Sequence, residues 1–373
     1  MRYLLYNLIL DKARRDRAHK AQLRASEACE AALRDELRAE IEQIQRVRRA
    51  FLPRVEEHRP WYKLHRGRNA AAFLSFVSLP PEAFRELLTV FARHYDIKSG
   101  AGLPGRPTSV PKHAALGLVL AMYTNAHNMP RLCELFGVTM STLSRIFPKA
   151  EAALALALAD VPNAAVAWPT QATLQRFAAA TEARSPEVSG VVGFVDVCTL
   201  AVQAPTVTDR RRFEDTDEAK WLDCDAVWGM LIVGVDGTLL WYKHNLPNFI
   251  DIALDVYEEL EHTAADKLRP DHILVAPATF PVTSESDGRI ETPLAAADDD
   301  DISISEKQGI ASLLGAAEWG TAHIKRVYRK FGHPLPFDRE LRRRRISNIL
   351  RLYNFRLRSM GTSPLHAALT GGV

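Results

Sequence analysis

Apolar positions in the first half of the chain recur every three or four residues, which is the spacing of amphipathic helices. Residues 11–58 are rich in Ala, Arg, Glu and Leu and predict one long, exposed helix. Such a basic helix would suit DNA, a partner helix or solvent alone. Between Pro80 and Pro162 the pattern predicts several further helices, interrupted by a Gly- and Pro-rich loop at 99–111.

The pattern changes after Trp168-Pro169, where continuous apolar runs replace the helical spacing. Such runs are typical of buried strands. They predict strands at Val191–Val202, Ala226–Val235, Thr238–Lys243 and His272–Phe280. The Asp236-Gly237 pair predicts a hairpin between the second and third strands. Residues 284–307 predict an acidic, mobile loop, and Gln308–Arg358 predicts two helices. The second half is therefore expected to be a mixed α/β domain that follows an α domain.

The segment from Pro130 to Phe147 has the spacing of a helix-turn-helix unit. Gly137 can adopt the positive φ of a tight turn, and Thr139 can cap the helix that follows. In such a unit the second helix reaches base edges and phosphates. The positions expected to do so are Thr139, Met140, Ser141, Ser144 and Arg145. The alternative is plain packing of three helices with no DNA contact.

Composition narrows the class of protein without identifying it. A chain of 373 residues is long enough for two or three domains. Its 47% apolar and 25% charged residues are typical of globular proteins. No apolar run approaches the ~20 residues of a membrane span, so no membrane partner is expected. Four cysteines without a CxxC spacing exclude a zinc ribbon and favour a nuclear or cytoplasmic protein.

The formal net charge of +3 hides a strong asymmetry along the chain. Residues 1–150 carry 25 basic and 14 acidic side chains, whereas residues 151–320 carry 11 basic and 29 acidic ones. Residues 321–373 carry 12 basic and 2 acidic side chains, including four consecutive arginines at 342–345. The arginines could form a phosphate-contacting or nuclear-localisation surface, or they could pair with the acidic segment. Charge sorted by segment leaves nucleic acid open as a partner.

Two carboxylates stand out against apolar surroundings. Asp196 lies in the middle of a predicted buried strand, where an ionised group is costly unless it is paired or bound to a metal. Glu318 lies on a predicted helix of otherwise apolar and small residues. Carboxylates on neighbouring elements hold the two cations of many nucleases. The alternatives are that Asp196 faces solvent and that Glu318 forms an ordinary ion pair.

Several ordered blocks resemble the PIF/Harbinger-type transposases over about residues 80–365. The blocks are Leu132–Ile146, Trp168-Pro169, Gly193–Asp196, Asp236–Thr238, Asn245–Pro247 with Asp251, Ala317–Gly320, and Leu352–Arg356 with Gly361. The resemblance implies a helix-turn-helix domain at 80–167 and an RNase H-like nuclease domain of the DDE superfamily at 168–365. A charged helical arm at 1–79 and a tail at 366–373 would flank them. Asp196 and Glu318 would be catalytic and would bind Mg²⁺ or Mn²⁺.

The chain also departs from the family pattern. The family's second catalytic Asp ends the fourth strand, where this chain has Pro277, and proline cannot ligate a metal. Asp251 is the best-placed substitute acid. The chain is therefore expected to be a transposase-derived, catalytically impaired protein that binds double-stranded DNA. One alternative is an active metal-dependent endonuclease that uses a substitute acid. Another is a non-enzymatic module for a protein partner or for homo-oligomerisation.

Overall fold

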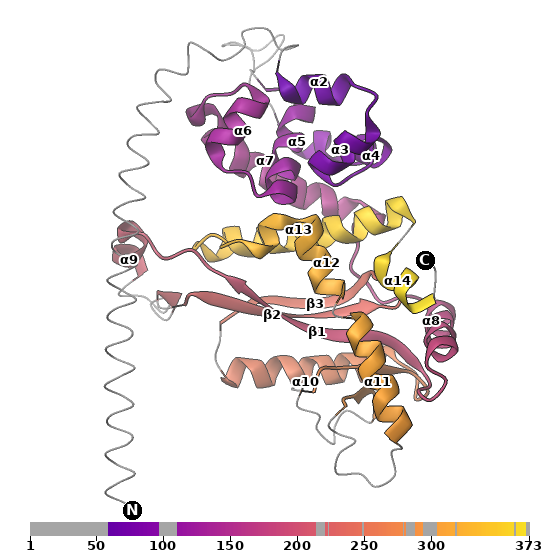
Figure 1. Cartoon of the computed structure of the whole chain (residues 1–373). Helices are drawn as coiled ribbons and strands as arrows, with labels where there is room; N and C mark the ends of the chain where they lie inside the picture. The colour runs from indigo at the N-terminus through magenta and orange to yellow at the C-terminus, as the bar shows by residue number, and fades with distance from the viewer. Residues whose placement is uncertain are drawn as a thin grey trace, which may run out of the picture. The chain divides into compact units, whose positions relative to one another are not determined.

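The structure is a computed structural model that describes residues 59–96, 110–213, 221–222, 224–247, 250–278, 280, 288–293, 304–317, 319–361 and 363–370. These described residues form thirteen α-helices and a five-stranded sheet, all within one compact unit that begins at residue 57 (Figure 1). The mixed α/β class predicted from the hydrophobic pattern is therefore confirmed. The exposed helix predicted at 11–58 lies outside the described residues.

The helical region precedes the sheet, as the spacing of apolar positions predicts. Its helices are α2 (Pro60–Arg66), α3 (Ala70–Val77), α4 (Pro81–His94), α5 (Lys112–Asn125), α6 (Met129–Phe136) and α7 (Met140–Asp160). α8 (Gln171–Arg184) leads into the sheet. Prolines begin α2 and α4, where the missing N–H costs no hydrogen bond. α7 continues through Pro148, so a second Ala-Leu helix after Phe147 does not form.

Trp61 is the centre of the helical core. Its side chain is fully buried, and its ring packs against those of Phe73, Phe84 and Phe136. Gly117 of α5 lies under this ring, because a Cβ atom there would come within 2.3 Å of Trp61 Cη2. The large ring and the missing side chain together let α2 pack closely on α5. This core therefore depends on one particular pairing of a large and a small residue.

A half-buried histidine pair adjoins Trp61 and is expected to make stability depend on pH. Trp61 Nε1 donates to His113 Nδ1 at 3.1 Å, and the His113 ring stacks on His65 at 4.2 Å. Burial, followed by the charges of His65 and Arg66, lowers the pKa of His113 to about 4. Because this pKa lies below its ordinary value of about 6.5, the neutral ring belongs to the folded state.

His113 should therefore make its full contribution to the free energy of unfolding above pH 6.5, and this contribution should be lost as the pH drops toward 4. We expect His113 to contribute about 1–2 kcal/mol of that loss, after allowance for its partial exposure. Urea unfolding at pH 7.5 and pH 4.5 measures the loss. His113→Asn keeps an acceptor for Trp61 and serves as the control. An equal loss in this variant and in the wild type would show that His113 plays no part.

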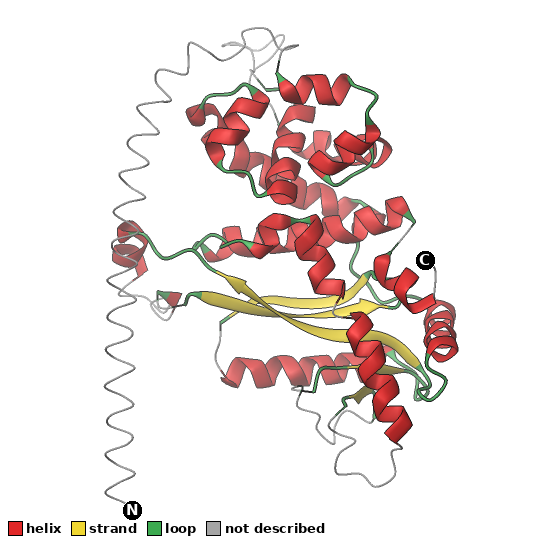
Figure 2. Ribbon diagram, in the orientation of Figure 1, coloured by secondary structure: helices red, strands yellow, loops and turns green. Residues whose placement is uncertain are grey.

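The sheet has the order β3-β2-β1-β4-β5 (Figure 2). Its strands are β1 (Val191–Ala201), β2 (Ala226–Gly234), β3 (Leu239–Leu246), β4 (Ile273–Val275) and β5 (Ile290–Glu291). β1, β2 and β3 are antiparallel neighbours, whereas β4 is parallel to β1 and β5 is parallel to β4. The predicted hairpin is confirmed, because Gly237 has φ +82° and Asp236 Oδ1 accepts from the Thr238 amide at 2.9 Å.

The fourth strand and the acidic segment differ from the prediction. β4 ends at Val275 because the chain turns at once, with the Phe280 amide donating to Pro277 O at 2.8 Å. The segment 284–307, predicted as a loop, contributes β5, whose Ile290 is 2% exposed. Ile290 lies opposite Leu274 of β4. An apolar residue in an acidic segment thus completes the edge of the sheet.

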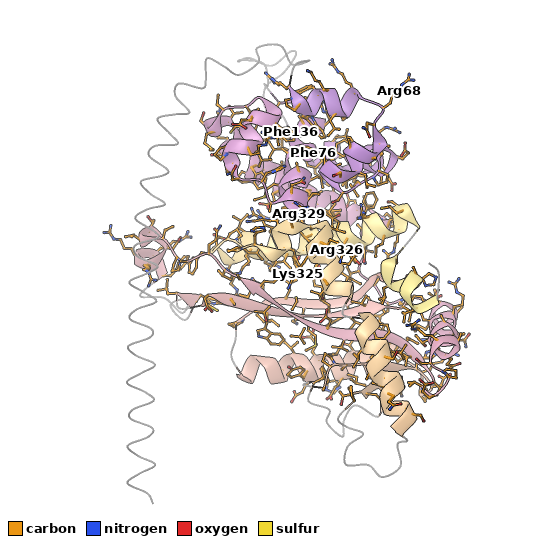
Figure 3. All side chains as sticks on the ribbon, viewed as in Figure 1. Arg68, Phe76, Phe136, Lys325, Arg326 and Arg329 are labelled. Carbon is orange, nitrogen blue, oxygen red and sulfur yellow. The ribbon has the colours of Figure 1, made fainter. Side chains whose placement is uncertain are left out.

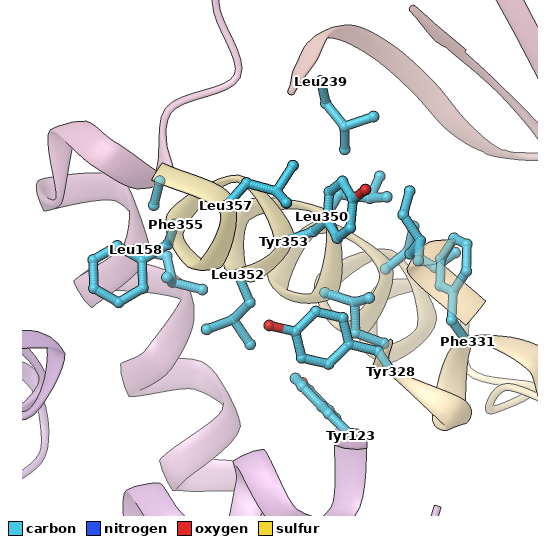
Figure 4. Packing of buried hydrophobic residues seen from close by; sticks show 14 of the residues in the cluster. Tyr123, Leu158, Leu239, Tyr328, Phe331, Leu350, Leu352, Tyr353, Phe355 and Leu357 are labelled. Carbon is cyan, nitrogen blue, oxygen red and sulfur yellow. The ribbon is translucent and has the colours of Figure 1, made fainter. Parts of the chain in front are cut away.

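Helices cover the sheet, and one of them also joins it to the helical region. They are α10 (Ile250–Lys267), α11 (Ile304–Ala317), α12 (Trp319–Val327), α13 (Arg339–Met360) and α14 (Pro364–Thr370). The short helix α9 (Val207–Phe213) buries none of its residues. The predicted two helices of 308–358 are therefore three, with the 3₁₀ turn η6 (Arg329–Gly332) between the last two. α13 contacts α7 on one side and β3 on the other. Its apolar residues, including Leu352 and Phe355, lie in a continuous core (Figure 4).

Candidate functional site

The α6–α7 turn has the geometry that the helix-turn-helix spacing predicts. Gly137 ends α6 with φ +64°, a conformation that costs glycine little. The Arg59 stem lies against this residue and leaves no room for a Cβ atom. Thr139 caps α7, its hydroxyl accepting from the Thr142 amide at 3.4 Å. Val138 is buried in the angle between the two helices. The local interpretation of Gly137, Val138 and Thr139 is confirmed.

The start of α7 presents a short polar surface to solvent. Ser141, Ser144 and Arg145 are exposed, and Thr139 and Met140 are half-buried. Arg145 Nε donates to Ser141 O at 3.1 Å, so the guanidinium lies along the first turns of the helix. Leu143 faces the core on the opposite side of α7. The five predicted contact residues therefore lie together on the first two turns, although their contact with DNA stays a prediction.

Asp196 is held between the sheet and α12. It is half-buried in β1 and lies opposite Leu231 of β2. Thr321 of α12 donates its hydroxyl to Asp196 Oδ2. Burial, followed by the charge of Asp196, raises the pKa of the nearby Cys198 thiol to about 12, while Lys325 acts in the opposite direction. The Asp196 carboxylate thus accepts from a buried hydroxyl.

Pro277 lies two residues beyond the end of β4. In the parallel pairing of β1 with β4, Phe194 lies opposite Val275, and this is the last pair of the register. Asp196 comes two residues after Phe194, and Pro277 comes two residues after Val275, where the chain already turns. Pro277 is half-buried, and its side chain has no oxygen. Position 277, where the resemblance expects the second catalytic aspartate, therefore carries no carboxylate.

The remaining acids of the predicted site are outside the described structure. Glu318 is not described, although helices end at Ala317 and begin at Trp319 on either side of it. Asp251 belongs to α10, but its side chain is not described. Within the ranges that the structure describes, no three His, Cys, Asp or Glu side chains could together hold a metal. The described residues alone therefore do not fit a two-metal site.

Sequence reasoning missed the hydroxyl that contacts Asp196. Thr321 is 8% exposed and lies three residues after Glu318. Residues three apart share a helix face. The helical spacing could therefore have associated Thr321 with Glu318 on the predicted helix, but it could not have identified the contact of Thr321 with Asp196. The available signal was the polar side chain of Thr321, since the prediction for this segment used only the carboxylate of Glu318.

Most arginines of α13 have partners within the protein. Arg342 is 1% exposed and donates to Asn245 Oδ1 and to the carbonyls of Pro336 and Phe337. Arg345 forms a buried ion pair with Glu151, at 2.6 Å between Nε and Oε1. Arg351, Arg356 and Arg358 donate to carbonyl oxygens of the helical region and its linker. Four of these arginines, Arg345, Arg351, Arg356 and Arg358, join α13 to the helical region, whereas Arg342 bonds within the second half.

Comparison with known proteins found no matching family model, no matching curated protein and no matching solved structure. Among the described helices, none combines the length and the apolar character that a membrane crossing requires. The functional argument therefore depends on the geometry of the two candidate surfaces, namely the start of α7 and the surroundings of Asp196.

Proposed function

We propose that this chain is a transposase-derived protein that binds double-stranded DNA through its helix-turn-helix unit, and that its nuclease domain is catalytically impaired. Duplex DNA is the main partner in this proposal. The nucleus or the cytoplasm is the proposed compartment, and Mg²⁺ or Mn²⁺ are the metals for any residual activity. The PIF/Harbinger-type transposases are the proposed origin.

The sheet supports an RNase H-like origin of the second domain. Three antiparallel strands followed by two strands parallel to the first, in the order β3-β2-β1-β4-β5, are the arrangement of RNase H-like sheets. Asp196 lies on the central strand β1, where the resemblance puts the first catalytic carboxylate. α12 begins directly after Glu318 and contacts the Asp196 carboxylate through Thr321. These features fit a nuclease ancestor.

The observation that carries the proposed impairment is Pro277, which follows β4 at the position where the resemblance expects the second catalytic aspartate. Two-metal cleavage of a phosphodiester needs several carboxylates to hold the cations and to offset their charge. A proline at this position removes one metal ligand where the family has an aspartate. The loss of a bridging ligand is expected to leave phosphodiester cleavage orders of magnitude slower.

Charge favours the helical region as the DNA surface. Residues 151–320 carry 29 acidic side chains against 11 basic ones, so they repel phosphates overall. The start of α7 is exposed and polar, and it carries Arg145. In a helix-turn-helix unit the second helix lies in the major groove while the first crosses the backbone. α7 is therefore the proposed base-reading helix.

Arg145→Ala should weaken duplex binding and flatten its dependence on salt. Each phosphate contact contributes about 0.9 to the slope of log affinity against log salt. We expect the slope to fall by about 1 if Arg145 contacts a phosphate. Fluorescence anisotropy with a labelled 30-base-pair duplex between about 50 and 200 mM salt measures this slope.

Arg176→Ala is the matched control for Arg145→Ala. Arg176 is likewise exposed and bonded within its own helix, to Thr173 Oγ1 at 3.2 Å, but it belongs to α8 at the far end of the sheet (Figure 1). It should leave both affinity and slope unchanged. Wild-type protein that binds no duplex, or binds with no salt dependence, would rule out the proposed function.

A further inference from the structure

Arg329 is a second basic side chain beside the helix-turn-helix unit, although η6, which carries it, lies far from that unit in the sequence. The loop between α5 and α6 places His127 next to Phe76, with ring centroids 6.2 Å apart. Arg131 extends from the first turn of α6 and is exposed. Burial lowers the pKa of His127, and the charges of Arg131 and then Arg329 lower it further. Arg329 belongs to η6, which packs against α5, the helix that runs into this loop.

The backbone around Arg329 is firmly fixed on the helical region. Tyr328 and Phe331, on either side of it, are fully buried, and η6 packs against α5. Ser78 Oγ donates to Val327 O at 3.2 Å. Asn125 Nδ2 donates to Phe76 O at 2.9 Å and so fixes the opposite side of the contact. Figure 3 labels Phe76 and Arg329 where the helical region meets η6.

The charges at this contact are poorly compensated within the protein. Arg131 pairs with Glu134 at 3.1 Å, in an exposed pair of the kind that contributes little. The structure gives the exposed Arg329 no hydrogen bond or ion pair with any described residue. Two guanidinium groups and a histidine thus converge from α6, η6 and the loop before α6. Such convergence is unfavourable in isolation and is relieved by a polyanion.

We propose that Arg329 contacts the phosphate backbone of duplex DNA, so that η6 extends the surface formed by Arg131 and His127. This inference rests on the proposed function. The first helix of a helix-turn-helix unit crosses the DNA backbone, and α6 carries Arg131 at that place. Arg329 adds a cation to the same surface on a firmly held backbone, and a backbone that is already ordered loses less entropy on binding. The C-terminal part of the chain thereby contributes directly to DNA binding.

The test compares full-length variants on a labelled 30-base-pair duplex of mixed sequence. Arg329→Gln is expected to lower the salt slope by about 1 and to weaken binding about 3- to 10-fold near 0.1 M salt. Arg329→Lys keeps the charge and should bind like the wild type, whereas Arg329→Glu should bind more weakly than Arg329→Gln. Arg176→Gln is the control. Thermal unfolding of each variant confirms the fold.

The outcomes distinguish the contact by Arg329 from the proposed duplex binding on which it rests. If Arg329→Gln and Arg329→Glu bind like Arg176→Gln while Arg145→Ala still weakens binding, the contact by Arg329 is refuted and the proposed function stands. If the wild type itself binds no duplex, both are refuted. A loss in Arg329→Gln that Arg329→Lys restores supports the inference, because packing alone would not depend on charge.

Discussion

Replacing Arg345 with methionine is expected to lower the free energy of unfolding by about 3–5 kcal/mol, because it leaves the Glu151 carboxylate buried without its cation. Glu151 is fully buried, and the Arg345 side chain is 7% exposed. Their Nε–Oε1 and Nη2–Oε2 distances are 2.6 and 3.1 Å. Breaking a buried pair costs far more than the pair contributes, since a buried charge without a partner cannot be solvated.

The polar groups around this pair determine which second substitution should rescue it. Tyr123 donates its hydroxyl to Glu151 Oε1 at 2.8 Å, and Asn348 Nδ2 donates to Glu151 O at 3.0 Å. Burial, and next the carboxylate, raise the pKa of Tyr123, so its hydroxyl stays protonated and donates. Glu151→Gln keeps an acceptor for Tyr123 while removing the charge. Added to Arg345→Met, it should restore at least half of the lost stability.

An exposed arginine of the same helix serves as the control for this cycle. Arg343 pairs with Glu340 at 2.8 Å, but the two side chains are 63% and 67% exposed. Arg343→Met should therefore cost less than about 1 kcal/mol. Urea unfolding of the wild type and of four variants gives the comparison. The variants are Arg345→Met, Glu151→Gln, the combination of these two, and Arg343→Met. A cost of under about 1 kcal/mol for Arg345→Met would mean that Glu151 is solvated or paired elsewhere.

Pro277→Asp is the change with the largest expected effect on chemistry. The wild type should leave supercoiled DNA intact in Mg²⁺ or Mn²⁺, since Pro277 stands where the resemblance expects the second catalytic carboxylate. An aspartate at 277 restores that group and is expected to raise metal-dependent nicking by about 10²–10³-fold, the scale of single electrostatic groups in active sites. The turn tolerates the change, because aspartate is favoured where the residue's carbonyl closes a turn, as Pro277 O does with the Phe280 amide.

Two further variants make the nicking result specific. Pro277→Asn has the shape of the aspartate but no charge and should stay inactive. Pro277→Asp combined with Asp196→Asn should lose whatever activity the aspartate restored. Nicking by the wild type that disappears in Asp196→Asn would overturn the proposed impairment and favour an active endonuclease with a substitute acid. Manganese binding measured by calorimetry gives a readout that is independent of DNA.

Features that depend on neighbouring residues could be predicted from the sequence. Gly137 and Thr139 form the turn and cap between α6 and α7, because a positive φ and a capping hydroxyl are local requirements. Asp236-Gly237 forms the hairpin for the same reason. The continuous apolar run of β1 identifies a strand that is buried on both faces over its first half. Each prediction needed only residues within one or two turns of chain.

Features that depend on distant partners could not be predicted in this way. The strand β5 forms where Ile290 meets Leu274 of β4 across a loop, and β4 itself is shorter than the apolar run at His272–Phe280 predicts. Thr321 donates a hydrogen bond to Asp196, although the two residues lie 125 positions apart in the sequence. No periodicity in either segment reports such a meeting. The roles of Asp196 and Pro277 therefore stay predictions from the sequence, and the contact of the Thr321 hydroxyl with Asp196 was not predicted.

By itself, the sequence determined that a helical half precedes a strand-rich half, that Gly137 and Thr139 form a turn and a cap between two helices, and that an aspartate lies within the apolar run of a strand. Only the tertiary structure decided what the basic C-terminal segment does. The same four arginines at 342–345 could have faced phosphates or carboxylates, because a charge does not specify its partner. The fold buries Arg342 and Arg345 and gives Arg345 a carboxylate 194 residues away. Burial determines that these two arginines bond within the protein and not to phosphates, since a charge removed from water needs an internal partner.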